Sequence, residues 1–316
     1  MKKVSVIMCT YNGERYLSKQ LDSILNQTYP IFELYIQDDC SSDSTIEIIQ
    51  GYQKKYPVIH YSVNPEQKGV NDNFYSAMEE AKGDYIAIAD QDDIWLPDKI
   101  EKGINCIGDS YLCFCLTKPF FEDGRDAHFD PNCLNFGLMR LITCNMVYGH
   151  TMLLRKELLQ LLQYKNNEIN YDHNLALLAV AHNKITFCNE ILCHYRRLND
   201  SVTFNSNPTS PEKTVRNGSH LLFSALRERK KLKIRANKFF SGMYFLLSKT
   251  NCQSQNVQDA MQLSKHLSKQ SFFSTLQAMI LCVKRKDEIF HKRDNNTLRA
   301  IARAICHPFL CYHYLK

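Results

Sequence analysis

Tyr85-Ile-Ala-Ile-Ala-Asp-Gln-Asp-Asp93 is the stretch that decides the fold of this chain. Its first five residues, Tyr85–Ala89, form an unbroken apolar run, which is typical of a short strand buried on both faces of a parallel sheet. Three carboxylates follow within four residues, at Asp90, Asp92 and Asp93. In open α/β sheets, ligands bind beyond the carboxyl ends of the strands. The stretch therefore predicts both a strand and a binding site at its end.

The residues upstream repeat this arrangement. Short apolar runs alternate with segments whose apolar residues have helical spacing, which predicts an α/β fold: a mostly parallel sheet flanked by helices. The predicted strands are Val4–Cys9, Phe32–Gln37 and Val58–Val63. The predicted helices are Glu14–Asn26, one that is capped by Ser41-Ser-Asp43 and runs to about Tyr52, Asn71–Ala81 and one that opens at Pro97.

The alternation is looser between residues 111 and 196. The predicted strands there are Leu112–Thr117, Thr151–Arg155, Lys184–Cys188 and Ile191–Arg196, and the predicted helices are Lys156–Gln163 and Tyr171–His182. Residues 199–219 are rich in Asn, Ser, Thr and Pro, which indicates a loop or linker, and the pattern after them is almost wholly helical. We therefore expect an α/β domain over residues 1–205, with halves 1–110 and 111–205, and a helical extension over 206–316.

The charge of the chain is unevenly distributed. The 316 residues carry a formal net charge of +6. Residues 1–212 contain 19 Lys and Arg against 28 Asp and Glu, a net charge of −9, whereas residues 213–316 contain 20 against 5, a net charge of +15. This asymmetry indicates two parts with different partners. The composition, 44% hydrophobic and 23% charged with 11 Gly and 9 Pro, excludes a disordered or collagen-like chain.

Cysteine usage and hydropathy predict a cytoplasmic protein. The 13 cysteines are odd in number and contain no C-x-x-C pair, which fits free thiols in a reducing compartment. The apolar run after the basic Met1-Lys2-Lys3 has only six residues, fewer than the roughly 7–15 of a signal-peptide core. No window of the sequence reaches the roughly 18 uninterrupted apolar residues of a spanning helix.

The acidic cluster after Ala89 suits a divalent cation. Neighbouring carboxylates repel one another at the end of a buried strand, and hard oxygen ligands select Mg²⁺ or Mn²⁺. Because Mg²⁺ leaves coordination positions for substrate phosphates, a metal-bound diphosphate is the expected occupant. The alternative is that these aspartates only cap and turn the chain ahead of Pro97. Asp38 and Asp39, which end the second strand, suit the N–H of a pyrimidine or a ribose hydroxyl, or else cap the next helix.

Four segments together resemble the N-terminal half of family 2 glycosyltransferases, which have the Rossmann-like GT-A fold. They are Val4-Ser-Val-Ile-Met-Cys-Thr-Tyr-Asn-Gly-Glu-Arg-Tyr-Leu17, Gln27-Thr-Tyr29, Gln37-Asp-Asp-Cys-Ser-Ser-Asp43 and Ile88-Ala-Asp-Gln-Asp-Asp93. The resemblance covers about residues 1–200 and is strongest to bacterial members that build O-antigens, capsules and other surface polysaccharides. It implies an inverting, metal-dependent hexosyl- or rhamnosyltransferase that uses a UDP- or dTDP-linked sugar and a glycan acceptor, commonly a lipid-linked diphosphate sugar.

The same resemblance assigns donor-binding roles to individual residues. It places the nucleoside against the first loop and the strand-two aspartate, and it maps the D-x-D element to Asp90-Gln91-Asp92. Asp90 is then expected near the ribose and Asp92 on Mn²⁺ or Mg²⁺, with Asp93 as an alternative metal ligand. The donor-binding residues carried over are Thr10, Tyr11, Asn12, Glu14, Asp39, Lys68, Asn73, Asp90, Gln91 and Arg196.

Asp172 is the expected catalytic base. It lies in Asn170-Tyr-Asp-His173, at the start of an apolar helix that resembles the family segment carrying that base. A carboxylate there can take the proton of the acceptor hydroxyl, and the helix N-terminus favours its ionised form. The alternative is a plain N-cap aspartate. His150 and Tyr171 are expected to line the acceptor pocket, although His150 also suits simple packing.

The basic C-terminal region interleaves cationic with apolar and aromatic residues, as in Lys230-Lys-Leu-Lys-Ile-Arg235 and Phe239-Phe-Ser-Gly-Met-Tyr-Phe245. Such a region suits an anionic membrane surface, so we expect a peripheral protein at the inner face of the cytoplasmic membrane. The alternative is a helical packing domain with a solvated basic face. A nucleic-acid partner is not expected, because no recognition motif accompanies the charge.

Two rival functions remain open. A sugar nucleotidyltransferase shares related architecture, but such enzymes usually carry a glycine-rich basic loop after strand one, where this chain has Thr10-Tyr-Asn-Gly13. The second rival function is that of a non-catalytic subunit of a polysaccharide assembly complex. The intact acidic clusters argue against it.

Overall fold

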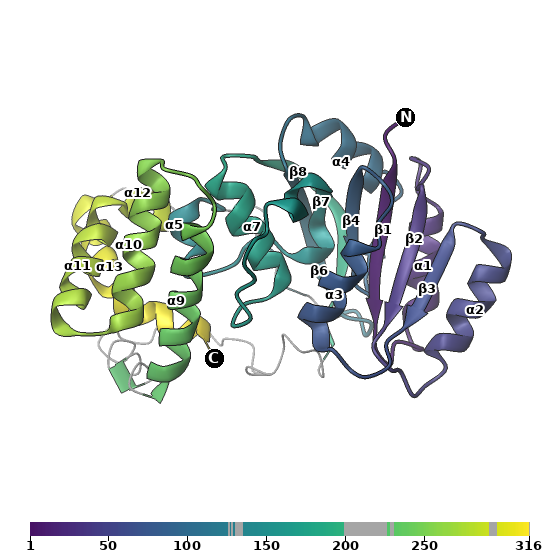
Figure 1. Cartoon of the computed structure of the whole chain (residues 1–316), viewed down its shortest axis with the longest axis horizontal. Coiled ribbons are helices and arrows are strands. Elements are labelled where there is room, and N and C mark those ends of the chain that lie inside the picture. The colour runs from purple at the N-terminus through teal and green to yellow at the C-terminus, as the bar shows by residue number, and fades with distance from the viewer. Residues whose placement is uncertain are drawn as a thin grey trace.

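A single mixed sheet forms the centre of the molecule. The computed structural model describes residues 1–125, 127, 129, 135–198, 226–227, 231–290 and 296–315. In this part of the chain, eight strands pair in the order β3-β2-β1-β4-β7-β6-β8-β5, and the C-terminal helices lie beyond one end of the sheet (Figure 1). The predicted α/β fold, mostly parallel and followed by a helical region, is confirmed.

The elements follow one another as the alternation predicts. The strands are β1 (Val4–Thr10), β2 (Glu33–Asp38), β3 (Ile59–Val63), β4 (Tyr85–Ala89), β5 (Ile94–Trp95), β6 (Leu112–Phe120), β7 (Met152–Arg155) and β8 (Ile185–Arg196). The helices between them are α1 (Leu17–Leu25), α2 (Thr45–Lys55), α3 (Gly69–Glu79), α4 (Lys99–Ile107), α5 (Leu138–Leu141), η1 (Gly149–Thr151), α6 (Glu157–Gln160) and α7 (Tyr171–Ala181). The C-terminal helices are α9 (Lys233–Ser248), α10 (Gln255–Lys269), α11 (Phe272–Lys284), α12 (Lys286–Ile289), α13 (Thr297–Leu310) and η2 (Cys311–Leu315).

The parallel part of the sheet brings the predicted site residues to one edge. β1 pairs in parallel with both β2 and β4, and β2 with β3. Thr10 lies opposite Asp38, and Met8 lies opposite Ala89, which directly precedes the acidic cluster. The strand ends that carry the polar residues therefore meet at the carboxyl edge, as the sequence predicts.

The second half of the sheet departs from simple alternation. β7 runs antiparallel between β4 and β6, and β6 pairs in parallel with β8. β8 is one strand where the sequence predicted two, and its pairing with β6 shifts register around Leu116. The two-residue β5, which was not predicted, pairs with β8 through Ile94 and Trp95. The acidic loop is thus held between β4 and β5.

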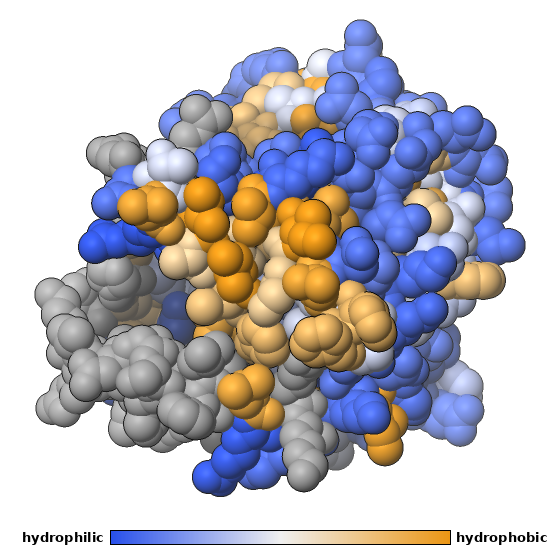
Figure 2. Space-filling view, turned by 90° about the vertical axis from the view of Figure 1, so that its left-hand side faces the viewer, coloured by the Kyte–Doolittle hydropathy of each residue, from blue (hydrophilic) through white to orange (hydrophobic). Residues whose placement is uncertain are grey.

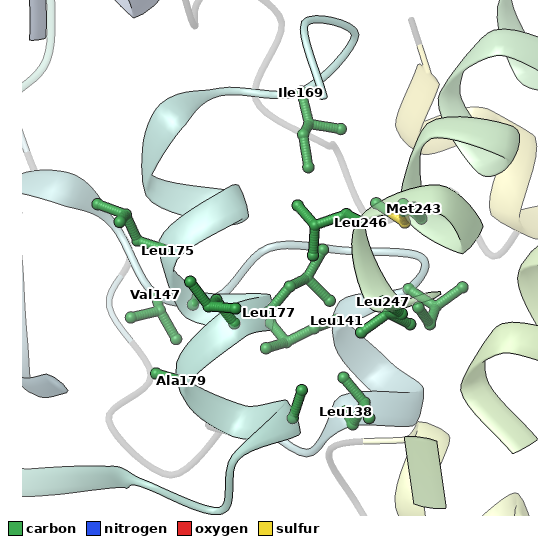
Figure 3. Close-up of a cluster of buried hydrophobic side chains, with 14 of the residues drawn as sticks. Leu138, Leu141, Val147, Ile169, Leu175, Leu177, Ala179, Met243, Leu246 and Leu247 are labelled. Atoms are coloured by element: carbon green, nitrogen blue, oxygen red, sulfur yellow. The ribbon is translucent and has the colours of Figure 1, made fainter. Parts of the chain in front are cut away.

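Each face of the sheet buries a separate apolar cluster, because successive strand residues point to opposite faces. In β1, Ile7 faces α3 and α7, whereas Val6 and Met8 face the side of α1 and α2. The first of these clusters continues into the C-terminal helices. Figure 3 shows Leu175 and Leu177 of α7 in the same group of buried side chains as Met243, Leu246 and Leu247 of α9. The C-terminal helices therefore pack directly on the α/β part.

Among the described residues, no helix has the length and the hydropathy needed to cross a membrane. The predicted linker at 199–219 and the predicted boundary between residues 205 and 206 lie outside the described residues.

Candidate active site

The loop after β1 is braced against the loop after β2. Asn12 adopts a left-handed backbone conformation, with φ 47°. Its N–H donates to the Ser41 hydroxyl at 2.8 Å, and its side-chain oxygen accepts from the Ser42 N–H at 2.8 Å. The Glu14 carboxylate accepts from the Ser44 N–H at 2.9 Å, at the start of α2. Asn12 and Glu14 thus shape the predicted nucleoside loop.

Asp38 holds the two strand ends together, a role that the sequence did not reveal. The Thr10 hydroxyl donates to Asp38 Oδ2 at 2.7 Å, and the Ser41 N–H donates to Asp38 Oδ1 at 2.8 Å. Asp38 is fully buried. The two carboxylates of the adjacent pair Asp38-Asp39 therefore have different partners: that of Asp38 bonds to the end of β1, whereas Asp39 reaches Thr10 only through its backbone N–H.

Asp39 faces the loop before α3. Its Oδ1 accepts from the Asn64 amide and from the Lys68 N–H, both at 2.8 Å, and its Oδ2 accepts from the Gly69 N–H at 2.9 Å. Asn73 completes this network, because its oxygen accepts a second hydrogen bond from the Asn64 amide at 2.8 Å. Asp39, Lys68 and Asn73, which lie far apart in the sequence, thus meet as one group beside the carboxyl edge.

Gln91 clamps the first loop to the acidic cluster. Its Oε1 accepts from the Tyr11 N–H at 2.9 Å, and its Nε2 donates to the Tyr11 carbonyl at 3.0 Å. Gly13 lies so close that a Cβ there would overlap the Gln91 amide. The Tyr11 ring itself is 49% exposed. The middle residue of the D-x-D element thus positions the loop through its backbone and leaves the Tyr11 ring open to a ligand.

The three aspartates of the acidic cluster differ in exposure. Asp90 and Asp92 are half-buried, whereas Asp93 is fully buried. Burial, together with the charges of Asp93 and Asp90, raises the pKa of Asp92 to about 7. Burial also raises the pKa of Asp93, whose Oδ1 accepts from the Arg196 N–H at 3.1 Å. Asp93 is therefore tied to β8 and does not cap α4, whose N-cap is Asp98.

Arg196 joins β8 to the acidic loop from inside the protein. Its side chain is buried, its Nε donates to the Asp92 carbonyl at 2.7 Å, and its guanidinium forms an ion pair with Glu122. The guanidinium carbon lies 4.3 Å from the ring centre of Tyr16 and 4.6 Å from that of Phe120. Among the residues that the structure describes, its buried Nη2 has no hydrogen-bond partner. One N–H group of Arg196, a residue predicted to bind the nucleotide sugar, is therefore without a partner in this part of the chain.

His150 lies beside two carboxylates of the acidic loop. Its Nδ1 is 3.4 Å from Asp90 Oδ2 and 3.7 Å from Asp93 Oδ2. Burial lowers the pKa of His150, but the charges of Asp93 and Asp90 outweigh burial, so that its pKa is raised. Its ring stacks between those of Tyr148 and Tyr195, with ring-centre distances of 6.0 Å and 5.2 Å. His150 therefore offsets part of the negative charge at this edge.

Asp172 is a buried carboxylate in the first turn of α7. The N-cap position is Asn170, so Asp172 is not the plain N-cap of the alternative interpretation. Its Oδ2 accepts from the Gly149 N–H at 3.1 Å, and its Oδ1 accepts from the His173 N–H at 2.6 Å. Burial raises the pKa of Asp172 to about 6, and the charge of Asp90 acts in the same direction. The predicted base is thus electrostatically coupled to the acidic cluster.

The two neighbours of Asp172 are packed in the interior. The Tyr171 ring stacks on Phe74 at a ring-centre distance of 4.2 Å, and its hydroxyl lies so close to Gly149 that a Cβ there would overlap it. The side chain of His173 approaches the Leu141 carbonyl at 2.6 Å, and burial lowers its pKa to about 4. Tyr171 therefore positions the turn that holds Asp172, and His173 is neutral.

A family model, Glycosyl transferase family 2, matches residues 5–163, which is half of the chain. The chain belongs to glycosyl transferase family 2. Over 114 residues it is 38% identical to TuaG of Bacillus subtilis (strain 168), a protein named for teichuronic acid biosynthesis. Over 105 residues it is 39% identical to the dTDP-rhamnosyl transferase RfbG of Shigella flexneri. These matches cover 36% and 32% of this chain and only 45% and 36% of the two relatives.

Solved structures share the fold of this family 2 chain. The structure of S. aureus TarS residues 1–349 with UDP-GlcNAc matches with a TM-score of 0.56 and 18% identity, over 98% of this chain and 89% of that one. The mannosyltransferase PcManGT from Pyrobaculum calidifontis, in complex with GDP-Man and Mn²⁺, matches with a TM-score of 0.52 and 14% identity, over 99% and 86%. At these identities the likeness establishes the GT-A fold alone.

The donor atoms of this family 2 site fit a hard divalent cation. Asp90 and Asp92 supply carboxylate oxygens at a half-buried position, where burial and mutual repulsion raise the pKa of Asp92. Asp93, His150 and Cys193 form a second group whose ligand atoms lie within 4.8 Å of one another, but burial raises the pKa of the Cys193 thiol well above its usual range. Carboxylates, and not this protonated thiol, therefore match Mg²⁺ or Mn²⁺.

Proposed function

We propose that this chain is an inverting glycosyltransferase that moves a sugar from a UDP- or dTDP-linked donor to a glycan acceptor. The observation that carries the proposal is the buried Asp172, whose pKa is raised to about 6 and whose charge is coupled to that of Asp90 in the D-x-D element. A base and a diphosphate-binding cluster that influence each other electrostatically are what glycosyl transfer needs. TarS, which binds UDP-GlcNAc, supports a nucleotide-sugar donor.

In this proposal the donor lies across the carboxyl edge of the sheet. The Tyr11 ring and Asp39 contact the nucleoside, and Asp90 lies near the ribose. Asp92, with Asp90 or Asp93, would hold Mn²⁺ or Mg²⁺, which when bound would offset the negative charge of the departing diphosphate. The unused Nη2 of Arg196 supports an additional contact to a phosphate oxygen. The metal assignment is supported by the carboxylate donor set and by the Mn²⁺ bound in PcManGT.

Asp172 acts as the base in this proposal. Its carboxylate takes the proton of the acceptor hydroxyl while that oxygen attacks the anomeric carbon from the face opposite the diphosphate. The bond between the sugar and the diphosphate breaks, and the configuration inverts. The N–H groups of Gly149 and His173 fix the orientation of the carboxylate. Acceptor contacts are expected from the nearby His150, and Tyr171 shapes the same wall.

We further propose a place in bacterial surface polysaccharide synthesis, with a lipid-linked acceptor at the inner face of the cytoplasmic membrane. The names of TuaG and RfbG support the polysaccharide class. The net charge of +15 over residues 213–316 supports an anionic membrane partner for the C-terminal region. The proposed division is a catalytic domain over residues 1–205, with a nucleotide-binding half (1–110) and an acceptor half (111–205), and a basic helical region over 206–316.

Asp172→Asn tests the function directly. The substitution keeps the size of the side chain and an oxygen that accepts from the Gly149 N–H, but it removes the base. We expect the transfer rate to fall by about 10²–10⁴-fold, the usual worth of general base catalysis. Binding of the nucleotide sugar with Mn²⁺, measured by calorimetry, should stay within about twofold. A variant that retains turnover would remove Asp172 from the mechanism, and a wild-type chain that binds no nucleotide sugar would refute the function.

A further inference from the structure

The free end of the C-terminal helices carries an apolar patch, which we call the α11–α13 face. Phe272 and Phe273, at the start of α11, are 78% and 77% exposed, and Leu298, at the start of α13, is 78% exposed. Figure 2 shows hydrophobic side chains gathered into one area on this side of the molecule, with hydrophilic residues above it and to its right. The other exposed apolar members on these helices are Leu276, Ile280 and Ile305. A patch of this kind marks an interaction site on a soluble surface.

The side chains that α11 and α13 bury are mostly small or polar, whereas several of their large apolar side chains are exposed. α11 buries Ser274, Thr275, Ala278 and Cys282, which are small or polar, and exposes its phenylalanines. α13 buries Ala300, Ala304, His307 and Pro308 in the same way. Helices that only cover a core direct their large apolar side chains toward it. The exposed apolar residues therefore suit a further apolar surface outside the protein.

The charge of the surroundings favours an anionic partner. Neither α11 nor α13 contains an acidic residue. The one acidic residue of the neighbouring α10 is Asp259, which is buried and paired with Lys284 at 3.3 Å. The two acidic residues of α12, Asp287 and Glu288, are paired with Lys286 at 3.2 Å and with Arg285 at 2.9 Å. Lys265 and Lys269 of α10 and Arg299 of α13 are exposed. Apolar side chains flanked by exposed cations match the acyl region and the anionic headgroups of a lipid surface.

We propose that the α11–α13 face docks on an anionic lipid bilayer. The inference rests on the proposed function, because it supplies the route by which a lipid-linked acceptor reaches the site. Along the molecule, β2 and β3 lie at the end opposite α11, and α7 lies between them (Figure 1). A bilayer at the α11–α13 face thus lies on the side of the acceptor half, with Asp172, and leaves the nucleotide-binding strands toward the cytosol.

A flotation assay with lipid vesicles tests this docking. We expect the full chain to float with vesicles of equimolar phosphatidylcholine and phosphatidylglycerol, and far less with phosphatidylcholine alone. The double variant Phe272→Ser/Phe273→Ser should weaken binding by about tenfold or more, because two aromatic rings lose their apolar environment. The matched control Tyr56→Ser/Val63→Ser removes apolar residues that are 40% and 47% exposed at the opposite end, and it should float like the wild type.

Two further measurements separate the outcomes. Calorimetry with a nucleotide sugar and Mn²⁺ should show that the Phe272→Ser/Phe273→Ser variant is folded and binds donor as the wild type does. Donor binding without flotation of the wild type would overturn the docking and leave the proposed function standing. Light scattering without vesicles gives the oligomeric state. A wild-type dimer that the double variant converts to a monomer, with unchanged flotation, would assign the face to a second copy and also overturn the inference.

Discussion

Asp172 combines burial with a proposed task, general base catalysis, that requires it to be ionised. The protein resolves this conflict with two backbone N–H donors, which favour the charged form, while burial disfavours it and leaves the pKa at about 6. Such a pKa lies close below neutral pH, where a base is both deprotonated and still basic enough to accept a proton. The geometry therefore gives an ordinary carboxyl group the properties of a general base.

This balance predicts how transfer depends on pH. Below a pH of about 6 the Asp172 carboxyl is protonated and cannot act as the base, so kcat/KM should fall about tenfold for each pH unit of acidification. Above that value kcat/KM should reach a plateau. The measurement uses saturating Mn²⁺, because burial also raises the pKa of Asp92, to about 7, in the protein without metal. A flat profile between about pH 5 and pH 8, with donor affinity unchanged, would contradict this role.

At the residue scale, sequence motifs identified the charged groups of the candidate site but not the hydrogen-bond and ion-pair partners that position them. Asp39, Asp90 and Asp172 could be singled out because each stands beside a strand end or a helix start. The ion pair of Arg196 with Glu122 joins residues that lie 74 positions apart in the sequence, so no local sequence pattern predicts it. The role of Asp38 could not be predicted either, because the sequence does not distinguish two adjacent aspartates. Only the pairing of β1 with β2 places the Asp38 carboxylate against the Thr10 hydroxyl.

At the scale of elements, the first four strands could be predicted to within one residue at each end, because a buried parallel strand is a short apolar run bounded by polar residues. The order of β7, β6 and β8 could not, since periodicity does not say which strands become neighbours. β5 has two residues, too few for any period. Its pairing with Cys193 and His194 of β8 nevertheless closes the acidic loop.

Gln91 joins the first loop to the acidic loop through hydrogen bonds to the Tyr11 backbone, so we expect substitutions of Gly13 and Gln91 to have coupled effects on donor binding. Gly13→Ala places a Cβ against the Gln91 amide, which two hydrogen bonds to Tyr11 hold in place. We expect Gly13→Ala to weaken donor binding by about tenfold, because overpacking that costs about 1–3 kcal/mol displaces the nucleoside loop. Gln91→Ala removes both the amide that a Cβ at position 13 would overlap and the two hydrogen bonds to Tyr11.

A double-mutant cycle distinguishes this coupling from two independent effects. In the Gln91→Ala background, adding Gly13→Ala should change donor affinity by less than about threefold, measured by calorimetry with Mn²⁺. Strict additivity of the two losses would mean that the clamp does not operate. The free energy of unfolding of each variant, from urea titration, checks that the loss is local.

At the scale of the whole molecule, the C-terminal helices are part of the folding unit and not an appendage. Leu246 of α9 is buried in the same apolar cluster as Leu175 of α7, and Asn166 donates a hydrogen bond to the Phe239 carbonyl of α9 at 3.2 Å. The change in net charge between the two parts of the sequence suggested separate units. Net charge describes the surface of each part and does not reveal that their buried side chains share one core. The shared core explains how the α11–α13 face is held in a fixed orientation relative to Asp172.

This shared core predicts a single unfolding transition. Leu246→Ala should lower the free energy of unfolding by about 2–5 kcal/mol, the usual cost of a cavity in a packed core, and it should lower the same transition that a nucleotide sugar with Mn²⁺ raises. The matched control is Ile234→Ala, on the same helix at a residue that is 77% exposed, and its effect should stay within about 0.5 kcal/mol. Differential scanning calorimetry measures both. A separate early transition in Leu246→Ala, with the donor-stabilised transition unmoved, would show that the C-terminal helices fold independently of the catalytic part.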